Sequence, residues 1–324
     1  MRVLVTGGAG YIGSFMTRLL LDRGFGVVVF DNLERGHKDA IDARSKLIEG
    51  DIKNKSDLES LFANDKFDAV MHFAAYISVE ESERSPEVYY QNNIVGSENL
   101  FKAAIDIGNV NKFIFSSSAA VYGNPQKISI PEDHPKKPTS EYGKNKLAME
   151  EILASERQNN PDVNFVALRY FNAAGASLDG SMGESHRPET HIIPLAINAA
   201  ISGSDFNLYG TDYKSPDGTC IRDYIHVLDL VESHVLALEK IEKEPGGYFY
   251  NVGTGHGYSN REVISEIEKV SGKKIHIVEK ERRPGDADQL IADPAKIKSE
   301  LGFSPKYSDL KTIVESAWRW HSKQ

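Results

Sequence analysis

The chain has 324 residues, of which 40% are hydrophobic and 26% are charged, and its formal net charge is -9. This composition is typical of a folded globular protein with one large or two modest domains. The acidic balance argues against nucleic acid as a partner, because phosphate backbones are bound by clustered Lys and Arg. Uninterrupted apolar segments stay below the roughly 18 residues of a membrane span, so we expect no membrane partner.

Cysteine and histidine usage narrows the class further. The single cysteine, Cys220, excludes an internal disulfide and a cysteine metal cage, and we interpret it as a small packing residue. Met1 leads directly into a strand pattern rather than a basic and then apolar signal region, so we expect a cytoplasmic protein. His186 and His191 match no metal-binding spacing, so we expect no metal.

Short β-rich runs alternate with longer helical patterns in the first half of the chain. The runs are apolar throughout rather than alternating, as in parallel strands that helices cover on both faces. This rhythm predicts an α/β fold with a Rossmann-type doubly wound parallel sheet. Predicted strands span residues 2–7, 27–31, 46–51, 67–75, 112–118 and 164–175, and predicted helices span 11–24, 86–105 and 141–153.

The pattern changes after Gly175 to loops, isolated helices and short strands, which indicates a smaller α/β lobe. We therefore predict a first domain over residues 1–175 and a second over 176–324. Residues 249–253 are apolar enough to rejoin the main sheet, so some segments of the second domain are expected to return to the first. Other predicted elements cover 192–201, 206–210, 220–227, 228–241 and a final helical run ending at Trp320.

A glycine-rich turn joins the first predicted strand to the first predicted helix. Gly7, Gly10 and Gly13 have the spacing that permits a tight turn, close approach of backbone to a pyrophosphate, and close helix packing. The N-H groups at the helix N-terminus then face the phosphates. We interpret this turn as a dinucleotide site.

Acidic residues end the next two predicted strands. Asp31 lies where a carboxylate accepts hydrogen bonds from an adenosine ribose and repels a 2′-phosphate, which favours NAD over NADP. Asp51 is placed for an adenine contact. The alternative is that Asp31 is a solvated turn residue beside Asn32 and Glu34, and Asp51 by itself is similarly ambiguous.

A candidate chemical centre combines a strand end with a helix. Tyr142 and Lys146 fall on one helix face, where the ammonium would favour the phenolate of a tyrosine whose unperturbed pKa is about 10. Ser118 ends the strand 112–118 and could hydrogen-bond a reacting alcohol. The alternatives are an ordinary exposed Tyr/Lys pair and serines that cap a turn, for which Ser116 and Ser117 are the better candidates.

In this order, the glycine turn, the strand-end serines and the Y-x-x-x-K pair resemble the extended short-chain dehydrogenase/reductase family. Within it, the chain is most similar to the enzymes that invert C4 of UDP-hexoses. The motifs TGGAGYIGS, HFAAY, SSSAAVYG, YGKNK, LRYFNAAGA, GTCIRDYIHVLDL, YNVGTG and RRPGD occur in the family's order over nearly the whole length. The family's Ser-Tyr-Lys centre corresponds to Ser118, Tyr142 and Lys146.

The resemblance implies two sets of binding residues, which assign NAD to the first domain and a UDP-sugar mainly to the second. Contacts to NAD are expected from Gly7, Gly10, Tyr11, Ile12, Gly13, Asp31, Asn32, Leu33, Glu34, Arg35, Gly36, Asp51, Ile52, Phe73, Ala74, Ala75, Tyr76, Ile77, Asn92, Ser116, Tyr142, Lys146 and Phe171. Contacts to the sugar nucleotide are expected from Ser118, Tyr142, Asn172, His191, Asn207, Leu208, Tyr209, Arg222, Arg283, Asp286 and Leu290.

Alternatives remain for individual residues and for the reaction. Phe73, Tyr76 and Phe171 could be core aromatics, and the two arginines could be surface residues. A related 4,6-dehydratase would need an acid after the strand-end hydroxyl, where this chain has Ala119 and Ala120. UDP-glucuronate epimerases and decarboxylases and a non-catalytic NAD-binding regulator are the other hypotheses.

The resemblance leaves the substrate range open and implies a homodimer. Leu290 aligns with a position that tends to be small in relatives that accept UDP-GlcNAc, and leucine is intermediate in bulk. The expected dimer contact runs through the helices over residues 90–105 and 142–154.

Overall fold

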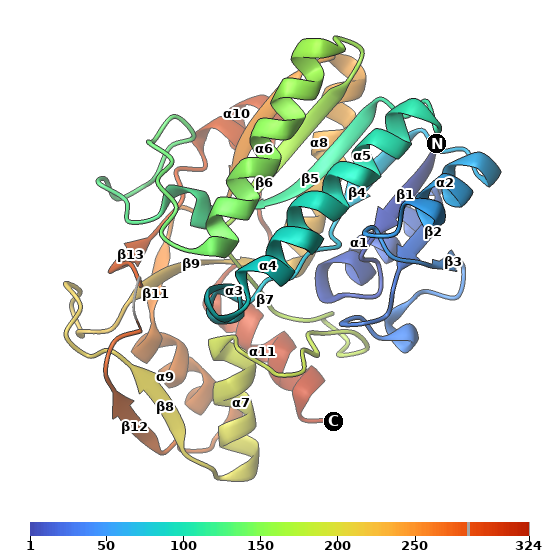
Figure 1. Cartoon of the computed structure of the whole chain (residues 1–324). Helices are drawn as coiled ribbons and strands as arrows, with labels where there is room; N and C mark the ends of the chain where they lie inside the picture. The colour runs from blue at the N-terminus through green and yellow to red at the C-terminus, as the bar shows by residue number, and fades with distance from the viewer. Residues whose placement is uncertain (284–285, 324) are drawn as a thin grey trace. The chain divides into compact units, whose positions relative to one another are not determined.

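The computed structural model describes residues 1–283 and 286–323, which form two compact units (Figure 1). Unit 1 contains residues 1–123, 136–169 and 231–250, and unit 2 contains residues 124–135, 170–230 and 251–323. Both units are discontinuous in sequence. The division at Gly175 is a simpler description, and the assignment of a binding role to each part stays a prediction.

Unit 1 is built on a seven-stranded sheet in the order β10-β6-β5-β4-β1-β2-β3. The pairs β1·β2, β1·β4, β2·β3 and β4·β5 are parallel, so the predicted doubly wound α/β sheet is confirmed. The chain reverses its direction of travel across the sheet between β1 and β4, where such folds bind ligands. The strands are β1 (Arg2–Thr6), β2 (Gly26–Asp31), β3 (Lys46–Glu49), β4 (Ala69–His72), β5 (Lys112–Ser118), β6 (Asn164–Tyr170) and β10 (Gly247–Val252).

Helices cover this sheet, with α5 and α6 in front of it and α8 behind it in Figure 1. Apolar residues of both layers, such as Phe62, Phe101, Phe113 and Leu153, are buried together. The predicted helix over 86–105 is divided by a wider π-helical turn, η2. The helices are α1 (Tyr11–Asp22), α2 (Lys55–Asn64), α3 (Val79–Arg84), α4 (Pro86–Tyr89), η2 (Tyr90–Gly96), α5 (Ser97–Asp106), α6 (Glu141–Asn159) and α8 (Val227–Lys243), with 3-10 turns η1 (Lys38–Ala40) and η3 (Ala119–Tyr122).

Unit 2 has two small sheets. Strand β9 pairs with β7 and β13 in parallel and with β11 in antiparallel orientation, while β8 and β12 form a separate parallel pair. The strands are β7 (Asn172–Ala174), β8 (Phe206–Tyr209), β9 (Ile221–His226), β11 (Gly257–Ser259), β12 (Ile277–Lys280) and β13 (Gln289–Leu290).

The core of unit 2 lies between its helices, where Ile193, Ile197, Val263, Ile267 and Ile313 are buried together. The helices are α7 (Ile192–Ser202), α9 (Asn260–Ser271), α10 (Ala295–Leu301) and α11 (Leu310–His321). The predicted final helical run corresponds to α11. In the part of the chain that the structure describes, every helix is too short or too polar to cross a membrane.

Candidate functional site

The glycine turn between β1 and α1 packs tightly against neighbouring backbone. Gly7 has a φ of +72°, and a Cβ there would lie 2.6 Å from the backbone of Phe73 and Ala74. A Cβ on Gly13 would lie 2.1 Å from the carbonyl oxygen of Gly7. Glycine is therefore required at both positions, for the turn itself and for the packing of α1.

The N-terminus of α1 has the features of an anion site. Its N-cap is Gly10, and no side chain of the described residues caps it. A Cβ on Gly10 would meet one atom within 4 Å, the carbonyl oxygen of Gly7 at 3.3 Å. Backbone N-H groups at such an end bind phosphates, and the missing Cβ leaves room for close approach. The residues present thus fit the pyrophosphate of a dinucleotide.

Asp31 is held by backbone at the end of β2. The residue is only 7% exposed, which does not fit a solvated turn residue. Its Oδ2 accepts a hydrogen bond from Ala9 N at 2.9 Å, and its Oδ1 accepts one from Leu33 N at 2.9 Å. Burial raises the pKa of the Asp31 carboxyl, against these two bonds, which lower it. Each oxygen keeps a further lone pair for a ribose hydroxyl.

Side chains that follow β2, β3 and β4 contact one another in pairs. Asn32 Nδ2 donates to Asp51 Oδ2 at 3.2 Å, and the Tyr76 hydroxyl donates to Glu34 Oε2 at 2.7 Å. The Arg35 guanidinium lies 5.1 Å from the centre of the Tyr76 ring. The structure therefore brings together these residues predicted to contact NAD, in two groups: Asn32 with Asp51, and Glu34 and Arg35 with Tyr76.

Other predicted NAD residues are more dispersed. Asn92 is buried and donates to Asn93 Oδ1 at 3.0 Å, an oxygen that also accepts from Tyr76 N at 2.8 Å. Phe73 packs against His234 with ring centres 5.0 Å apart, and Ile77 is 41% exposed. The predicted residue Phe171 belongs to unit 2.

The candidate chemical centre lies within unit 1. Ser118 is the last residue of β5, and Tyr142 and Lys146 occupy the first two turns of α6. A hydrogen bond joins Tyr142 to Ser118, and Lys146 Nζ lies 5.8 Å from the centre of the Tyr142 ring. Lys146 Nζ also donates to the carbonyl oxygen of Ser116 at 2.6 Å. The structure brings the three predicted residues together.

Burial has the largest effect on the pKa values of Tyr142 and Lys146. It raises the pKa of Tyr142 to about 12, although the hydrogen bond with Ser118 acts to lower it. It lowers the pKa of Lys146 to about 7, although the charge of Glu150 acts to raise it. In the protein alone Tyr142 is thus neutral and Lys146 keeps only part of its positive charge near neutral pH, whereas the sequence-based hypothesis has the ammonium promoting the phenolate. Ionisation of Tyr142 near neutral pH requires additional positive charge beside it.

A buried polar network lies next to the centre, and sequence reasoning missed it. Arg169, 1% exposed, donates to both carboxylate oxygens of Glu150 at 2.8 and 2.7 Å and to the Tyr122 hydroxyl at 2.7 Å. Ser117 Oγ donates to the same carboxylate at 2.6 Å. Ser118 Oγ instead accepts a hydrogen bond from Ala120 N at 3.2 Å and caps η3. The expectation that Ser116 and Ser117 are the better turn caps is therefore wrong.

Three of the residues predicted to contact the sugar nucleotide lie close together in unit 2. Arg222 Nη2 lies 3.5 Å from Asp286 Oδ1, and Leu290 of β13 is opposite Arg222 of β9 in the strand register. The Arg222 side chain is only 11% exposed, which does not fit a surface arginine. Its Nη1 donates to the carbonyl oxygen of Ala287 at 2.9 Å. The guanidinium is thus held in place before any ligand binds.

A second pair of predicted residues lies where β8 and β12 end. The Arg283 guanidinium is 4.3 Å from the centre of the Tyr209 ring. Leu208 is buried in the core, so only its backbone can face a ligand, whereas Asn207 is exposed. Pro284 and Gly285 of the RRPGD motif lie outside the described residues.

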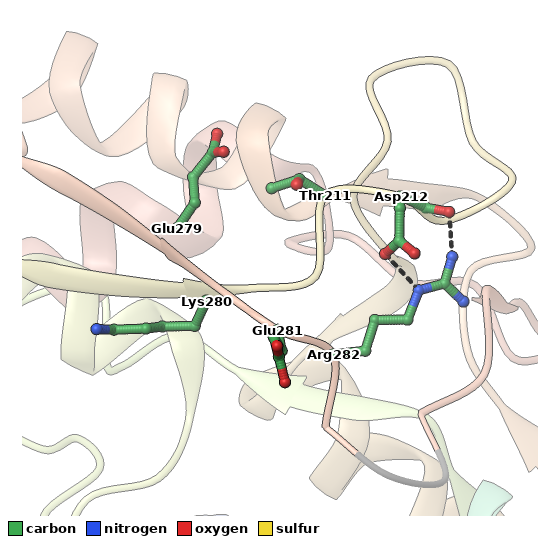
Figure 2. A pocket seen from close by; sticks show the side chains of 6 residues that line it. All are labelled: Thr211, Asp212, Glu279, Lys280, Glu281 and Arg282. Atoms are coloured by element: carbon green, nitrogen blue, oxygen red, sulfur yellow. Dashed lines mark hydrogen bonds and ion pairs between the residues drawn. The ribbon is translucent and has the colours of Figure 1, made fainter.

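An open pocket of about 530 Å³ adjoins these strand ends, and Figure 2 shows its lining. It was not predicted from the sequence. Arg282 Nε donates to Asp212 Oδ1 at 2.6 Å and fixes one side of the pocket. Its lining residues are Thr211, Asp212, Glu279, Lys280, Glu281 and Arg282.

The two remaining predicted substrate residues occupy other surroundings. Asn172 opens β7 and is paired with Tyr224 of β9. His191 Nδ1 lies 2.6 Å from Glu184 Oε1 and 3.2 Å from Glu189 Oε1, immediately before α7. His191 is thus part of a carboxylate cluster of its own.

The chain belongs to the NAD dependent epimerase/dehydratase family, whose model matches residues 3–253. It is 46% identical over 322 residues to the UDP-glucose 4-epimerase of Lactobacillus helveticus, covering 99% of this chain and 97% of the relative. It is 44% identical over 326 residues to that of Lacticaseibacillus casei, with the same two coverages.

Solved structures agree with the sequence relatives. The UDP-glucose 4-epimerase from Brucella ovis in complex with NAD has a TM-score of 0.93 and 44% identity, over 98% of this chain and 97% of that one. The enzyme from Bifidobacterium longum in complex with NAD⁺ and UDP has a TM-score of 0.95 and 38% identity, over 100% and 98%. These findings confirm the predicted fold, the resemblance stated from the motifs, and NAD as the cofactor.

Proposed function

We propose that this chain interconverts UDP-glucose and UDP-galactose by inverting C4 of the hexose. The observation that carries the proposal is the Ser118-Tyr142-Lys146 centre of unit 1, in a chain 46% identical to a UDP-glucose 4-epimerase over nearly its whole length. Bound NAD supplies the redox chemistry, since its nicotinamide can accept a hydride from C4 and return it to the opposite face.

In this proposal the chain's residues move one proton. Tyr142 removes it from the sugar 4-hydroxyl, and Ser118, already hydrogen-bonded to Tyr142, orients that hydroxyl and relays the proton. Lys146 contacts the cofactor ribose and adds positive charge beside Tyr142. Because burial raises the pKa of Tyr142 to about 12, the charge of the bound cofactor is part of what makes it a base.

Unit 2 is proposed to supply the groups that bind the UDP part. Arg222 and Arg283 provide guanidinium donors, which match a diphosphate well. Asp286 orients Arg222, and Leu290, opposite Arg222 in the strand register, limits the space for a substituent on the sugar. UDP-GlcNAc and UDP-GalNAc are further candidate substrates, and Leu290 is the residue on which their acceptance depends.

We further propose a cytoplasmic homodimer. Large apolar side chains are exposed at the start of the first predicted dimer helix and in the two short helices before it: Tyr90 at 46%, Val88 of α4 at 49% and Val79 of α3 at 48%. A partner that covers them would remove this apolar surface from water. Sedimentation velocity should give twice the mass of the chain, and a monomer at micromolar concentration would refute the dimer.

The reaction is tested with protein purified without added cofactor. Incubation with UDP-galactose and UDP-GalNAc separately, followed by product identification, tests reaction, substrate and cofactor retention together. A dehydrated product, or conversion of UDP-glucuronate alone, would point to the related enzymes instead.

The role of Tyr142 is tested by Tyr142→Phe. We expect turnover to fall by about 10²–10⁴-fold, the usual contribution of a general acid-base group. Affinity for UDP, measured by calorimetry, should stay within about twofold because the UDP contacts are elsewhere. A variant of near-native rate would refute this assignment.

A further inference from the structure

Four side chains in the segment before α7 point their ligand-type atoms at one another. They are Glu184, His186, Glu189 and His191, and one nitrogen or oxygen from each lies within 4.8 Å of the others. Glu184 Oε1 is 2.9 Å from His186 Nδ1 and 2.6 Å from His191 Nδ1. Two imidazoles therefore share one carboxylate oxygen, and Glu189 Oε1 approaches the same His191 nitrogen, Nδ1, at 3.2 Å.

The segment that carries this cluster is long and irregular. Residues 175–191, all of which the structure describes, contain no helix or strand. Irregular segments of this length are uncommon in compact proteins unless they are functional or held by specific contacts. Two side chains of α11 hold this segment. Trp320 Nε1 donates a hydrogen bond to the carbonyl oxygen of Glu184 at 2.9 Å, and Arg319 Nη1 donates one to the carbonyl oxygen of Leu178 at 2.6 Å.

Burial distinguishes the cluster from an ordinary surface ion pair. Glu184 is 4% exposed, and the other three residues are partly buried. The second carboxylate is oriented by backbone, since Glu189 Oε1 accepts from Thr190 N at 2.7 Å and from His191 N at 2.8 Å. Carboxylates and imidazoles fixed by outer hydrogen bonds are the usual arrangement around a protein-bound metal ion.

We propose that Glu184, His186, Glu189 and His191 form a structural site for a first-row divalent cation, with Zn²⁺ as the ion to test. Zn²⁺ takes imidazole nitrogen and carboxylate oxygen at about 2.0–2.2 Å in tetrahedral geometry, which separates neighbouring ligand atoms by about 3.4 Å. The observed separations of 2.6–3.2 Å need to open by less than about 1 Å to admit the ion.

Four protein ligands leave no open position, so the ion is assigned a structural role. The ion would tie Glu184 and His186, inside the irregular segment, to His191, the N-cap residue of α7. The proposal does not depend on the epimerase reaction, and it makes His191 a metal ligand rather than a direct contact to the sugar nucleotide. The rival is a metal-free cluster in which a protonated His191 lies between Glu184 and Glu189.

The first experiment measures metal content in tag-free protein purified without chelator. We expect about one Zn²⁺ per wild-type chain and less than about one tenth in His186→Ala and in Glu189→Gln. His276→Ala is the matched control, because His276 belongs to the same unit, has a side chain that is 73% exposed, and pairs with the single carboxylate of Asp205. The control should keep the wild-type content.

The second experiment needs no variant. Chelator-treated wild-type protein should bind one equivalent of added Zn²⁺ in calorimetry, and its thermal midpoint should rise by about 5 °C at saturating Zn²⁺. Co²⁺ should give the intense visible absorption of a four-coordinate site. Zn²⁺ should leave the thermal midpoint of His186→Ala unchanged.

Two results would overturn the proposal. One is wild-type protein that contains less than about one tenth of an equivalent of metal and shows neither heat nor a midpoint shift with Zn²⁺. The other is His186→Ala that binds Zn²⁺ as the wild type does. Either would leave the metal-free ion cluster as the explanation, and neither bears on the epimerase activity, so the two proposals fail separately.

Discussion

The two units hold buried charge in different ways. In unit 1 the main buried ion pair is side chain to side chain, between Arg169 at 1% and Glu150 at 2% exposure. In unit 2 the buried carboxylates of Asp223 and Asp229 are held mainly by backbone, whereas Glu184 is contacted by two histidines. Asp223, fully buried, accepts from the N-H groups of residues 254, 255 and 292 at 2.9–3.1 Å, and Asp229 accepts from those of residues 306 and 307 at 2.8 Å.

This difference follows from how each unit is built. Unit 1 has long regular elements whose backbone groups are already paired, so a charge buried between them, such as Glu150, needs another side chain, whereas Asp31 at the end of β2 is held by backbone. Unit 2 has short strands joined by loops whose N-H groups need acceptors, and a carboxylate can bind several of them at once. Buried charge thus fixes side chains near the chemical centre of unit 1 and fixes loop conformations in unit 2.

The largest expected change in the free energy of unfolding concerns the buried ion pair of unit 1. Glu150→Ala leaves the buried Arg169 guanidinium without its carboxylate, which should lower the free energy of unfolding by about 3–5 kcal/mol. Glu151→Ala is the control, since Glu151 is the exposed next residue of α6, and we expect a change within about 0.5 kcal/mol. Urea unfolding followed by circular dichroism measures both. Equal effects would show that the ion pair does not hold unit 1 together.

The sequence could predict unit 1 far better than unit 2. Apolar runs such as β1 and β2 and the fixed spacing of Gly7, Gly10 and Gly13 are local signals, so the strands and the glycine turn could be read directly. Tyr142 and Lys146 were found because helical spacing puts them on one face. The π-helical turn η2 was missed, because nothing in the periodicity of residues 86–105 marks it.

What the sequence could not predict depends on contacts between distant loops or elements. Glu150 and Arg169 belong to different elements, and each alone looks like an exposed charged residue. The cluster around Glu184 lacks cysteine and matches no familiar metal motif, so the expectation of no metal rested on missing patterns rather than on geometry. Helix α9 did carry a local signal that was overlooked, the capping box of Ser259 and Glu262.

A prediction of intermediate size concerns a feature that both units share, a buried histidine that is neutral in the folded protein. In unit 1, His72 lies 2.7 Å from both Thr6 Oγ1 and Ser97 Oγ, and burial lowers its pKa to about 3, with the charge of Lys146 acting in the same direction. In unit 2, burial lowers the pKa of His226 to about 4, although Asp229 acts to raise it.

Because both folded pKa values are depressed, their stability contributions are present above about pH 6.5 and are lost as pH falls toward 4 and 3. Between pH 6.5 and pH 5 each histidine should account for about 2 kcal/mol of lost stability. His72→Asn and His226→Asn should each remove that part of the pH dependence in urea unfolding. An acid slope identical to wild type in both variants would mean that neither histidine stays neutral in the folded protein.

The smallest expected effect compares the helix caps of the two units. Ser140 caps α6 through Gly143 N at 3.1 Å, and Ser259 caps α9 through Glu262 N at 3.1 Å. Replacing either serine by Ala should lower the free energy of unfolding by about 1 kcal/mol. Only Ser140→Ala should also lower kcat, by up to about tenfold, because its helix turn carries Tyr142.

Measuring kcat and unfolding in both variants separates stability from positioning. If Ser140→Ala keeps the wild-type kcat, the first turn of α6 is held by its other contacts, of which the bond from Tyr142 N to Ser82 Oγ at 3.1 Å is the first to test. If Ser259→Ala lowers kcat as much as Ser140→Ala does, loss of a cap acts on catalysis through general stability. The distinction between a unit that positions the chemistry and a unit whose caps serve only its own folding would then be wrong.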